Sequence, residues 1–233
     1  MSDLKILVCY HKDCDLLPPY LNHDVYVNVH GGRKLYKGDS KFLLSLQGDD
    51  NGENISDLNP IFNELTVVYW GWKNLDKIGN PNYVGLNHYR RMFAPSTIED
   101  YHDYDMMIWG NILTKGKIAN ITLRQQFEHH HGKRPLENLF KYIDEEKQDY
   151  SYIKEYFEKQ TFYSKNMFIM KRNVFEEYCN LLFPFLFGMM KYFDGNENFR
   201  DRSFVAERIS SILFERLSVK YKTKFLDIPI QYI

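Results

Sequence analysis

The sequence predicts a single α/β domain over residues 1–233, with a mixed sheet flanked by helices. Short apolar runs of β-forming residues, typical of buried strands, alternate along the chain with segments of helical periodicity. Such alternation is typical of α/β architecture. The length of 233 residues suffices for a buried core, and 44 % hydrophobic and 26 % charged residues is the composition of a globular protein.

The first half of the chain contains buried strands and one capped helix. Asn59 suits the capping position of that helix, and Pro60 suits its first helical position. Apolar residues from Leu58 to Trp72 recur at spacings of three and four, which extends the helix to Asn74. In order, the predicted elements are the strand Lys5–Tyr10, the strand Asp24–His30, a long loop over residues 31–56, the helix Asn59–Asn74, a turn at residues 77–82 and the strand Tyr83–Tyr89.

The second half alternates in the same way, with longer helices. Pro184 is expected to interrupt one of them, because proline lacks the amide hydrogen that a helix interior needs. Pro229 is tolerated in a strand at the edge of a sheet. The predicted elements are the strand Asp105–Trp109, the helix Leu123–His131, two helices within Pro135–Glu158, the strand Asn166–Met170, the helix Val174–Phe187, a polar loop over Asp194–Asp201, the helix Ser203–Val219 and an edge strand in the tail after Lys224.

Charge and cysteine usage exclude several classes of protein. The net charge of −1 gives no field that would recruit nucleic acid or an anionic membrane. Cys9, Cys14 and Cys179 are odd in number and irregular in spacing, which argues against a disulfide framework or a zinc site. A reducing cytosol is the compartment that fits such cysteines.

The sequence leads us to expect neither a signal peptide nor a membrane span. Its N-terminus lacks a basic segment followed by a long apolar stretch, and no window approaches the run of about 20 apolar residues that crosses a bilayer. Leu181–Met190 is short and contains Pro184 and Gly188, so a buried helix is preferred over contact with a membrane surface. The sequence predicts a cytoplasmic protein, and peripheral association with the inner face of the plasma membrane stays open.

Aromatic residues make up 16 % of the chain, with 18 Tyr and 17 Phe. Rings give a large contact area at low entropy cost, so enzymes use them to stack on sugars or bases. The same residues also fill cores, and composition leaves both interpretations open.

Polar residues follow the first predicted strand, where Tyr10 and His11 stand. In open α/β sheets, ligands bind beyond the carboxyl ends of the strands. The chain has neither a GxGxxG sequence nor a Walker lysine motif, which argues against a conventional dinucleotide or ATP site. The pattern therefore indicates a nucleotide-binding start without a glycine-rich phosphate loop.

The segment YVGLNHYRRMF delivers His88, Tyr89, Arg90 and Arg91 to the end of another buried strand. The planar donor fork of arginine suits phosphate oxygens. Adjacent residues of an extended chain point to opposite sides, so only one of the two arginines is expected to face a given ligand. A solvated turn or a structural ion pair is the alternative interpretation.

Three other polar segments are candidates for chemistry. In GDDNGENIS, Asp49 and Asp50 are candidates to bind a metal or a sugar hydroxyl, whereas Asn54 and Ser56 can equally hydrogen-bond the loop to itself. Residues 129–131 are three histidines that diverge around a helix, so no zinc site is expected, although one can face a cleft.

The third segment, RDRSFVAER, places carboxylates next to arginines near a predicted helix start. Asp201 or Glu207 is a candidate general base, provided that burial raises the pKa of its carboxyl. A local salt-bridge network with Arg202 and Arg208 is the alternative.

Five segments occur in an order that resembles a known family. They are GDDNGENIS, NELTVVYWGWKN, YVGLNHYRRMF, NMFIM and AERI. The chain resembles the bacterial capsule and O-antigen glycosyltransferases long classed as a domain of unknown function, whose founding activity is β-galactofuranosyl transfer. The resemblance runs from KILVCYHK to the helix after Arg202. Departures are Asn51 and Glu53 in place of Thr and Asp, which bears on sugar choice, Ser203 in place of Gly, and Ile209 in place of Leu.

The resemblance implies a GT-A-type, Rossmann-related fold that transfers a sugar, galactofuranose by family, from a UDP-sugar. The acceptor would be a growing capsular or O-antigen glycan, free or lipid-linked, and the reaction is expected to be inverting. Residues His88 to Arg91 take the place where most GT-A enzymes carry a metal-binding Asp-x-Asp motif. Fixed cations can stabilise a leaving diphosphate, so no cofactor is expected to be required, and a weak dependence on divalent metal stays open.

The same resemblance assigns roles to individual residues. Asp103 and Asp105 form an Asp-x-Asp sequence, but it precedes a strand, so no metal ligand is assigned. Glu207 is the first choice of base and Asp201 the second. The donor side is assigned to Tyr10, His11, Asp49, Asp50, Asn54, His88, Tyr89, Arg90 and Arg91, and the acceptor side to His130, Asn166 and Arg208.

Two rival classes of function remain. One is a nucleotide-sugar hydrolase that uses the same carboxylates. The other is a non-catalytic carbohydrate-binding or assembly protein of a capsule locus. The cluster of histidine and arginine at a strand end argues against the second, because lectins rarely need a diphosphate clamp. No nucleic-acid partner is expected.

Overall fold

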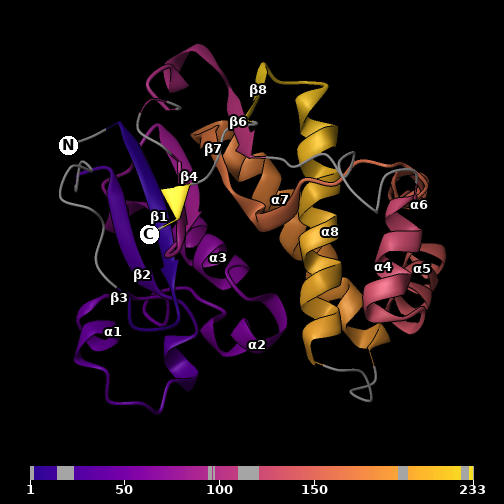
Figure 1. The fold of residues 1–233 in the computed structure, drawn as a ribbon, viewed down its shortest axis with the longest axis horizontal. Coiled ribbons are helices and arrows are strands. Elements are labelled where there is room, and N and C mark those ends of the chain that lie inside the picture. The colour runs from indigo at the N-terminus through magenta and orange to yellow at the C-terminus, as the bar shows by residue number, and fades with distance from the viewer. Residues whose placement is uncertain are drawn as a thin grey trace.

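The computed structural model describes residues 3–14, 24–93, 96, 98–109, 121–193, 199–226 and 231–232. Within them, strands gather on one side and long helices on the other (Figure 1). The strands are β1 Leu4–Tyr10, β2 Tyr26–His30, β3 Gln47–Gly48, β4 Tyr83–His88, β5 Arg91–Met92, β6 Met106–Trp109, β7 Phe168–Lys171, β8 Thr223–Leu226 and β9 Gln231–Tyr232.

The helices alternate with these strands, as the sequence predicts. The α-helices are α1 Lys41–Ser45, α2 Asn59–Phe62, α3 Leu65–Lys73, α4 Leu123–His131, α5 Arg134–Glu145, α6 Ser151–Phe157, α7 Arg172–Met189 and α8 Phe199–Ser218. Short 3-10 turns are η1 Arg33–Leu35, η2 Ser56–Leu58, η3 Leu75–Ile78, η5 Tyr101–Asp103, η6 Ser164–Asn166 and η7 Met190–Tyr192. The predicted single α/β domain with a mixed sheet is confirmed.

The strand order of the sheet reverses between β1 and β4. Its order is β3-β2-β1-β4-β7-β6-β8, with β5 paired to β4 and β9 paired to β5. β1 is parallel to both β2 and β4, whereas β7 runs antiparallel to β4 and to β6. The chain leaves β1 toward β2 on one side and returns to β4 on the other. In open α/β sheets, a crevice for ligands forms outside the carboxyl ends of the strands at such a reversal.

Both faces of the central strands are buried, which explains their continuous apolar sequence. On β1, Leu7 and Cys9 belong to the larger core, which α3, α7 and α8 share, while Ile6, Val8 and Tyr10 belong to a smaller core on the opposite face. The larger core therefore fixes the helices against one face of the sheet, and it brings α8 near the ends of β1 and β4.

The helix predicted over residues 59–74 is broken into α2 and α3. Asn63 adopts φ 48° and ψ −130°, a conformation that no helix contains, so the backbone turns between the two segments. Pro60 occupies the first turn as predicted, but the side chain of Asn59 does not cap, because its Nδ2 donates to the carbonyl of Asn63 at 2.9 Å. The apolar residues keep their helical spacing across the break, so the break cannot be predicted from that spacing.

Other boundaries differ for physical reasons. Residues 31–56, predicted as a loop, contain η1, α1 and β3. The helix α7 runs through Pro184 without a break, since one lost backbone hydrogen bond is outweighed by its buried face. α8 begins at Phe199, four residues before the predicted start, which places Glu207 in its third turn rather than its first. Residues 194–198 of the predicted polar loop and Pro229 of the tail lie outside the described residues.

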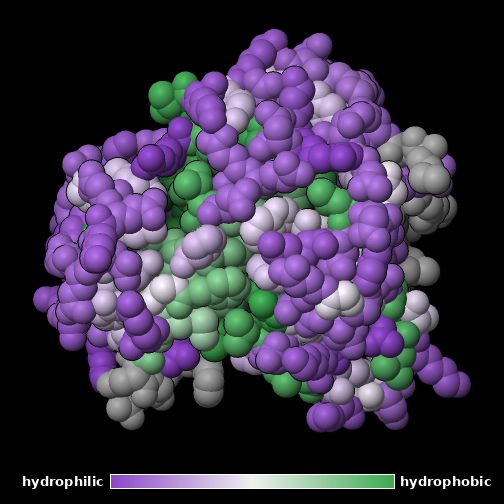
Figure 2. All heavy atoms as spheres, turned by 180° about the vertical axis from the view of Figure 1, so that it is seen from behind, coloured by the Kyte–Doolittle hydropathy of each residue, from purple (hydrophilic) through white to green (hydrophobic). Residues whose placement is uncertain are grey.

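The apolar segment Leu181–Met190 is mainly a buried helix, as preferred from sequence. Leu182, Phe183, Phe185 and Leu186 are all at most 2 % exposed, whereas Phe187 is 38 % exposed. The back of the molecule shows apolar side chains gathered in its middle among hydrophilic ones (Figure 2). None of the helices in the described parts of the chain is long and apolar enough to span a membrane.

Candidate active-site cleft

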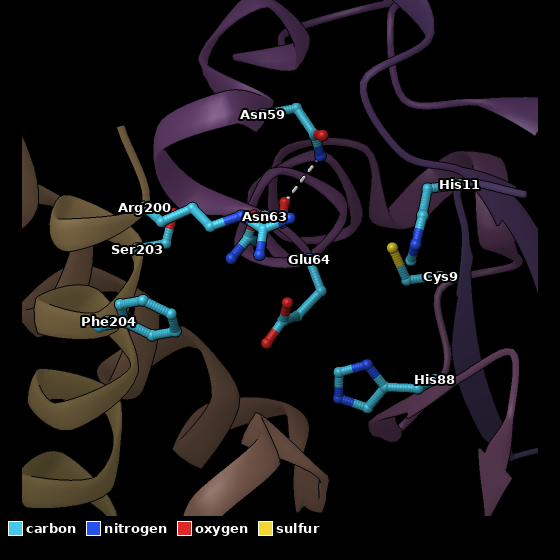
Figure 3. Close-up of a pocket in the computed structure, with 9 residues that line it drawn as sticks. All are labelled: Cys9, His11, Asn59, Asn63, Glu64, His88, Arg200, Ser203 and Phe204. Carbon is cyan, nitrogen blue, oxygen red and sulfur yellow. Dashed lines mark hydrogen bonds between the residues drawn. The ribbon is translucent and has the colours of Figure 1, made fainter. Parts of the chain in front are cut away.

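A cleft lies on the helical face of the sheet, beside the carboxyl ends of β1 and β4. It consists of a hollow of about 390 Å³ and an adjoining one of about 160 Å³. Strand ends line one side and α8 lines the other, with the start of α3 between them (Figure 3). The described lining residues are Cys9, His11, Asn59, Asn63, Glu64, His88, Arg200, Ser203 and Phe204 in the larger hollow, joined in the smaller by Phe62, Leu65, Arg91, Lys165, Asn166 and Glu207.

The break between α2 and α3 presents Glu64 to this cleft. Asn63 turns the chain, and Glu64 follows it directly, before the first residue of α3. The carboxylate of Glu64 points into the space between His88 and the side chains of α8 (Figure 3). Its Oε1 accepts a hydrogen bond of 2.7 Å from Nδ2 of Asn166.

Glu64 also affects Cys9, which lines the same hollow. Burial raises the pKa of the Cys9 thiol well above its usual value, and the nearby charges of Glu64 and Asp49 raise it further. The thiol therefore stays protonated at neutral pH, which removes the thiolate that nucleophilic catalysis by cysteine requires.

His11 stands where the first strand opens into the cleft, in positively charged surroundings. Burial lowers the pKa of His11, and the neighbouring charges of Lys12, Arg90 and His88 lower it further. The ring packs edge-on against Tyr89, with centroids 4.9 Å apart. The cationic surroundings suit an anionic ligand such as a diphosphate.

His88 and Glu207 contact the backbone of Lys165 at its carbonyl and at its amide, respectively. The carbonyl of Lys165 can only accept, so Nε2 of His88 carries the hydrogen that joins them at 2.5 Å. The backbone N–H of Lys165 donates to Oε1 of Glu207 at 2.9 Å. Lys165 and Asn166 have φ values of 78° and 51°, an unfavourable region for residues with a side chain, and these contacts hold them there.

The two arginines after β4 lie on different sides, as their adjacency predicts. Arg91 is partly buried and lines the smaller hollow. Arg90 is exposed, and its guanidinium lies 4.9 Å from the ring centroid of Tyr89. Tyr89 itself is 5 % exposed. Arg91 is therefore the better placed of the two to meet a ligand in the cleft.

The predicted donor residues of the loop act within the fold instead. Asp49 is fully buried, and its two carboxylate oxygens accept hydrogen bonds from the backbone of Gly32 and Arg33 and from the hydroxyls of Ser56 and Thr66. These four bonds tie the loop to the start of α3. Asp49 therefore has no free oxygen for a sugar or a metal.

Asn54 closes the loop on itself, which was the alternative left open by the sequence. Its Nδ2 donates to the carbonyls of Asp50 and Gly52, and its Oδ1 accepts from the amide of Ser56. The side chain of Asp50 is exposed and does not line the described part of the cleft. Tyr10 is also outside the cleft, because it is fully buried in the smaller core, and burial raises the pKa of its hydroxyl to about 12.

The acceptor-side assignments are met in part. Asn166 lines the smaller hollow, but His130 is exposed on α4, next to His129. The neighbouring His131 instead stacks on Phe204, a residue that lines the cleft, with ring centroids 3.8 Å apart. Burial lowers the pKa of His131 to about 4.

Arg208 is internal rather than available to an acceptor. It is 3 % exposed, its Nη1 donates to Oε2 of Glu207 at 2.8 Å, and its Nη2 donates to Oε1 of Gln126 at 3.2 Å. Its guanidinium also lies over Phe162, 4.2 Å from the ring centroid. The local ion-pair alternative drawn from the sequence therefore describes Arg208 and Glu207.

The two carboxylates assigned as base differ in position from the prediction. Glu207 lines the smaller hollow, but both of its oxygens already accept hydrogen bonds, from Lys165 and Arg208. Asp201 lies in the first turn of α8 and is not among the described residues that line the cleft. No three His, Cys, Asp or Glu side chains within the described ranges gather as a metal site would require.

Several residues that line the cleft were not predicted from the sequence. Glu64, Asn63 and Phe204 lay within apparently regular helical patterns, and Arg200 lay in an apparent loop. The segment NELT did carry a signal, since Asn and Glu interrupt an apolar run at the position where the helix breaks.

Comparison with known structures defines the fold class. The chain is similar to a structure described as "WbbM bifunctional glycosytransferase apo structure", with a TM-score of 0.65 and 23 % sequence identity. The match covers 100 % of this chain and 45 % of that one, so the chain spans less than half of its neighbour. The fold is thus similar to that of a glycosyltransferase structure.

The family follows from the sequence itself. Residues 5–224 match the model of the family described as "Domain of unknown function (DUF4422)", and the chain belongs to that family. No curated protein matches the chain.

Proposed function

We propose that this protein is a glycosyltransferase, which moves a sugar from a nucleoside diphosphate onto a hydroxyl of a glycan acceptor. One observation carries the proposal. A cleft at the strand-order reversal of a glycosyltransferase-like fold combines a carboxylate, Glu64, with the basic side chains of His11, Arg91 and Arg200. A transferase needs both kinds of group, because it activates a hydroxyl and stabilises a leaving diphosphate.

The basic residues are proposed to bind the diphosphate. Arg91 offers a planar fork for phosphate oxygens, and His88 and His11 stand at the ends of β4 and β1 beside it. Such fixed donors stabilise the charge that develops on the leaving group without rearranging. The proposal needs no metal ion, and transfer should survive EDTA. Loss of transfer in EDTA with recovery in manganese would contradict this part.

The donor and the pathway are proposed from the resemblance of the motifs. The segments around Glu64 and His88 resemble those of capsule and O-antigen glycosyltransferases that use galactofuranose. We therefore propose UDP-galactofuranose as the donor, a growing capsular or O-antigen glycan as the acceptor, and inversion at the anomeric carbon. The similar structure is that of a bifunctional glycosyltransferase, and this chain would correspond to one of its parts.

The compartment proposed is the cytoplasm, with association at the inner face of the plasma membrane where a lipid-linked acceptor would be presented. The three cysteines Cys9, Cys14 and Cys179 are free thiols, as a reducing compartment requires. Cell fractionation tests this part, since a protein recovered in the periplasm or in the medium, and in neither the cytosolic nor the plasma-membrane fraction, would contradict it.

Ligand binding tests the proposal directly. UDP at a hundredfold excess over its dissociation constant stabilises the native state by about 2.7 kcal/mol, so the melting temperature should rise with UDP and with UDP-galactofuranose. A parallel screen with GDP, CMP and dTDP sugars tests the choice of nucleotide. Absence of a shift with every nucleotide would contradict the transferase and favour a non-catalytic protein.

Product analysis separates transfer from hydrolysis. A transferase releases UDP faster when a glycan acceptor is added and forms a new glycoside. A nucleotide-sugar hydrolase releases the free sugar at the same rate with or without the acceptor. The second result would replace the proposed activity with the rival one while leaving nucleotide binding intact.

A further inference from the structure

We infer that Glu64 is the general base that removes the proton from the acceptor hydroxyl. This inference rests on the proposed function and names a catalytic residue for it. The carboxylate lies in the cleft between the strand ends and α8, where donor and acceptor would meet (Figure 3). It lines both hollows, so a group bound in either one can reach it.

The two oxygens of Glu64 have different surroundings. Oε1 accepts the 2.7 Å hydrogen bond from Asn166, which fixes the plane of the carboxylate. Within the described ranges, Oε2 has no hydrogen-bond donor, and Glu64 forms no ion pair. A base requires this arrangement: one oxygen held and one oxygen open to the incoming hydroxyl.

The only other carboxylate among the described lining residues is already in use. Glu207 accepts the amide hydrogen of Lys165 at one oxygen and the guanidinium of Arg208 at the other. To take a proton, Glu207 would have to give up a bond to a cation that is 3 % exposed, which is costly. Glu64 faces no such competition.

The fold positions Glu64 from two directions. On one side, the break at Asn63 aims the side chain into the cleft, and Asn59 stabilises that break through its bond to the carbonyl of Asn63. On the other side, the strained turn at Lys165 aims Asn166 at Glu64. Asn166 is therefore a positioning residue.

Asn166 also leaves room for a substrate. Its side chain is 2 % exposed, and its Oδ1 is buried with no hydrogen-bond partner among the described residues. Buried polar atoms almost always have a partner. A hydroxyl of the acceptor sugar in the smaller hollow would supply the missing donor. An adjacent hydroxyl of the same sugar would then lie next to the carboxylate of Glu64, which removes its proton.

The step balances as a single displacement. The acceptor hydroxyl gives its proton to Oε2 of Glu64 while its oxygen forms a bond to the anomeric carbon of the donor. The bond between that carbon and the phosphate oxygen breaks, and its electron pair leaves with the nucleoside diphosphate. Attack and departure occur on opposite faces, so the product has the inverted configuration, and Glu64 then releases the proton to water.

The test compares three substitutions in the full chain. Glu64→Gln removes the base and keeps the shape, Glu64→Asp keeps a carboxylate, and Glu215→Gln is the matched control, because Glu215 pairs with Lys159 outside the cleft. Calorimetry measures UDP affinity. Turnover of UDP-galactofuranose is measured with octyl galactoside or water, which both lose a proton, and with azide, which does not.

Glu64→Gln is expected to bind UDP within about threefold of the wild type and to lose about 100-fold or more in turnover with the hydroxyl acceptors. Its reaction with azide should stay within about tenfold of the wild type, because azide needs no base. Glu64→Asp should recover part of the loss, and Glu215→Gln should match the wild type.

Four results would overturn the inference. Turnover by Glu64→Gln near the wild-type rate shows that another group takes the proton. An equal loss with azide and with hydroxyl acceptors, or a product of retained configuration, shows that Glu64 does not act as a base in a single displacement. A wild type that neither binds UDP nor consumes any nucleotide sugar overturns the proposed function itself, and the inference with it.

Discussion

Asn166 donates a hydrogen bond of 2.7 Å to a carboxylate oxygen of Glu64, although 102 residues separate the two along the chain. Both residues sit at or beside backbone positions that are unfavourable for ordinary side chains. Asn63, just before Glu64, has φ 48°, and Lys165 and Asn166 have φ 78° and 51°. Local strain of this kind costs about 1–3 kcal/mol per residue and persists where the surrounding structure enforces it. Its occurrence on both sides of one carboxylate supports the proposal that this cleft is the functional site.

Asn166→Gly should reduce turnover about tenfold while UDP affinity stays unchanged, because glycine keeps the positive φ and removes the side-chain amide that orients Glu64 and faces the acceptor rather than the nucleotide. Steady-state kinetics and calorimetry measure the two quantities. Asn80→Gly is the matched control, since Asn80 has φ 49° outside the cleft, and it should be neutral. A loss of UDP affinity equal to the loss of turnover would show that Asn166 contacts the donor instead.

Glu207→Gln should destabilise the fold by about 2–4 kcal/mol. Removing one partner of a buried ion pair typically costs about 3–5 kcal/mol, and the value here is lower because the side chain of Glu207 is 24 % exposed. Urea unfolding measures the change. Glu215→Gln loses only the more exposed pair with Lys159 and should cost less than about 1 kcal/mol. A fully stable Glu207→Gln variant without transfer activity would return the role of base to Glu207.

The strands and most helices of this fold can be predicted from the sequence, because burial on both faces imposes continuous apolar runs. Leu123–His131 is predicted with its observed bounds, since a helix end after three histidines and before Gly132 is a local signal. Strand order and direction are not local properties. That β7 inserts antiparallel between β4 and β6 depends on contacts between segments far apart in the chain.

The residues of the candidate site that follow a strand were the easiest to predict, although Asn166 and Glu207, which do not, were also assigned and line the smaller hollow. His11 and His88 were found because the ends of buried strands are local features. Asp49 was assigned to the donor because its loop looks polar, but its acceptor capacity is satisfied by Gly32, Ser56 and Thr66, which the sequence does not reveal. Glu64 was missed because the apolar period continues across the break at Asn63.

Arg91→Ala should weaken UDP binding by about 10- to 100-fold, which corresponds to the loss of a hydrogen bond to a charged group worth about 1.5–3 kcal/mol. Arg90→Ala should weaken it less than about threefold, because Arg90 lies over Tyr89 outside the cleft lining. Calorimetry with UDP compares the two. Arg91→Lys should fall between them, since lysine keeps the charge without the planar fork. A larger loss of UDP affinity in Arg90→Ala than in Arg91→Ala would place the diphosphate beside Arg90, outside the cleft.

His131 is expected to make the stability of the fold sensitive to acid. Its ring stacks on Phe204, and its pKa is lowered to about 4, chiefly by burial and next by the charge of Arg208. In the unfolded chain, the pKa of histidine is about 6.5. The unfolded state therefore binds a proton between these two values while the native state does not. Native stability falls as the pH drops through this window, and the contribution of neutral His131 is complete above a pH of about 6.5.

The effect can be isolated with His131→Phe, which retains an aromatic ring beside Phe204 and removes the titrating group. Between pH 7 and pH 5, the wild type is expected to lose more of its free energy of unfolding than this variant, as measured by urea unfolding at both pH values. His129→Phe is the matched control, because His129 is exposed on the same helix and should leave the pH dependence of the wild type unchanged. If wild type and His131→Phe lost stability in parallel, the acid sensitivity would come from other groups, such as the carboxylates. His131 would then be protonated at a similar pH in the native and the unfolded states.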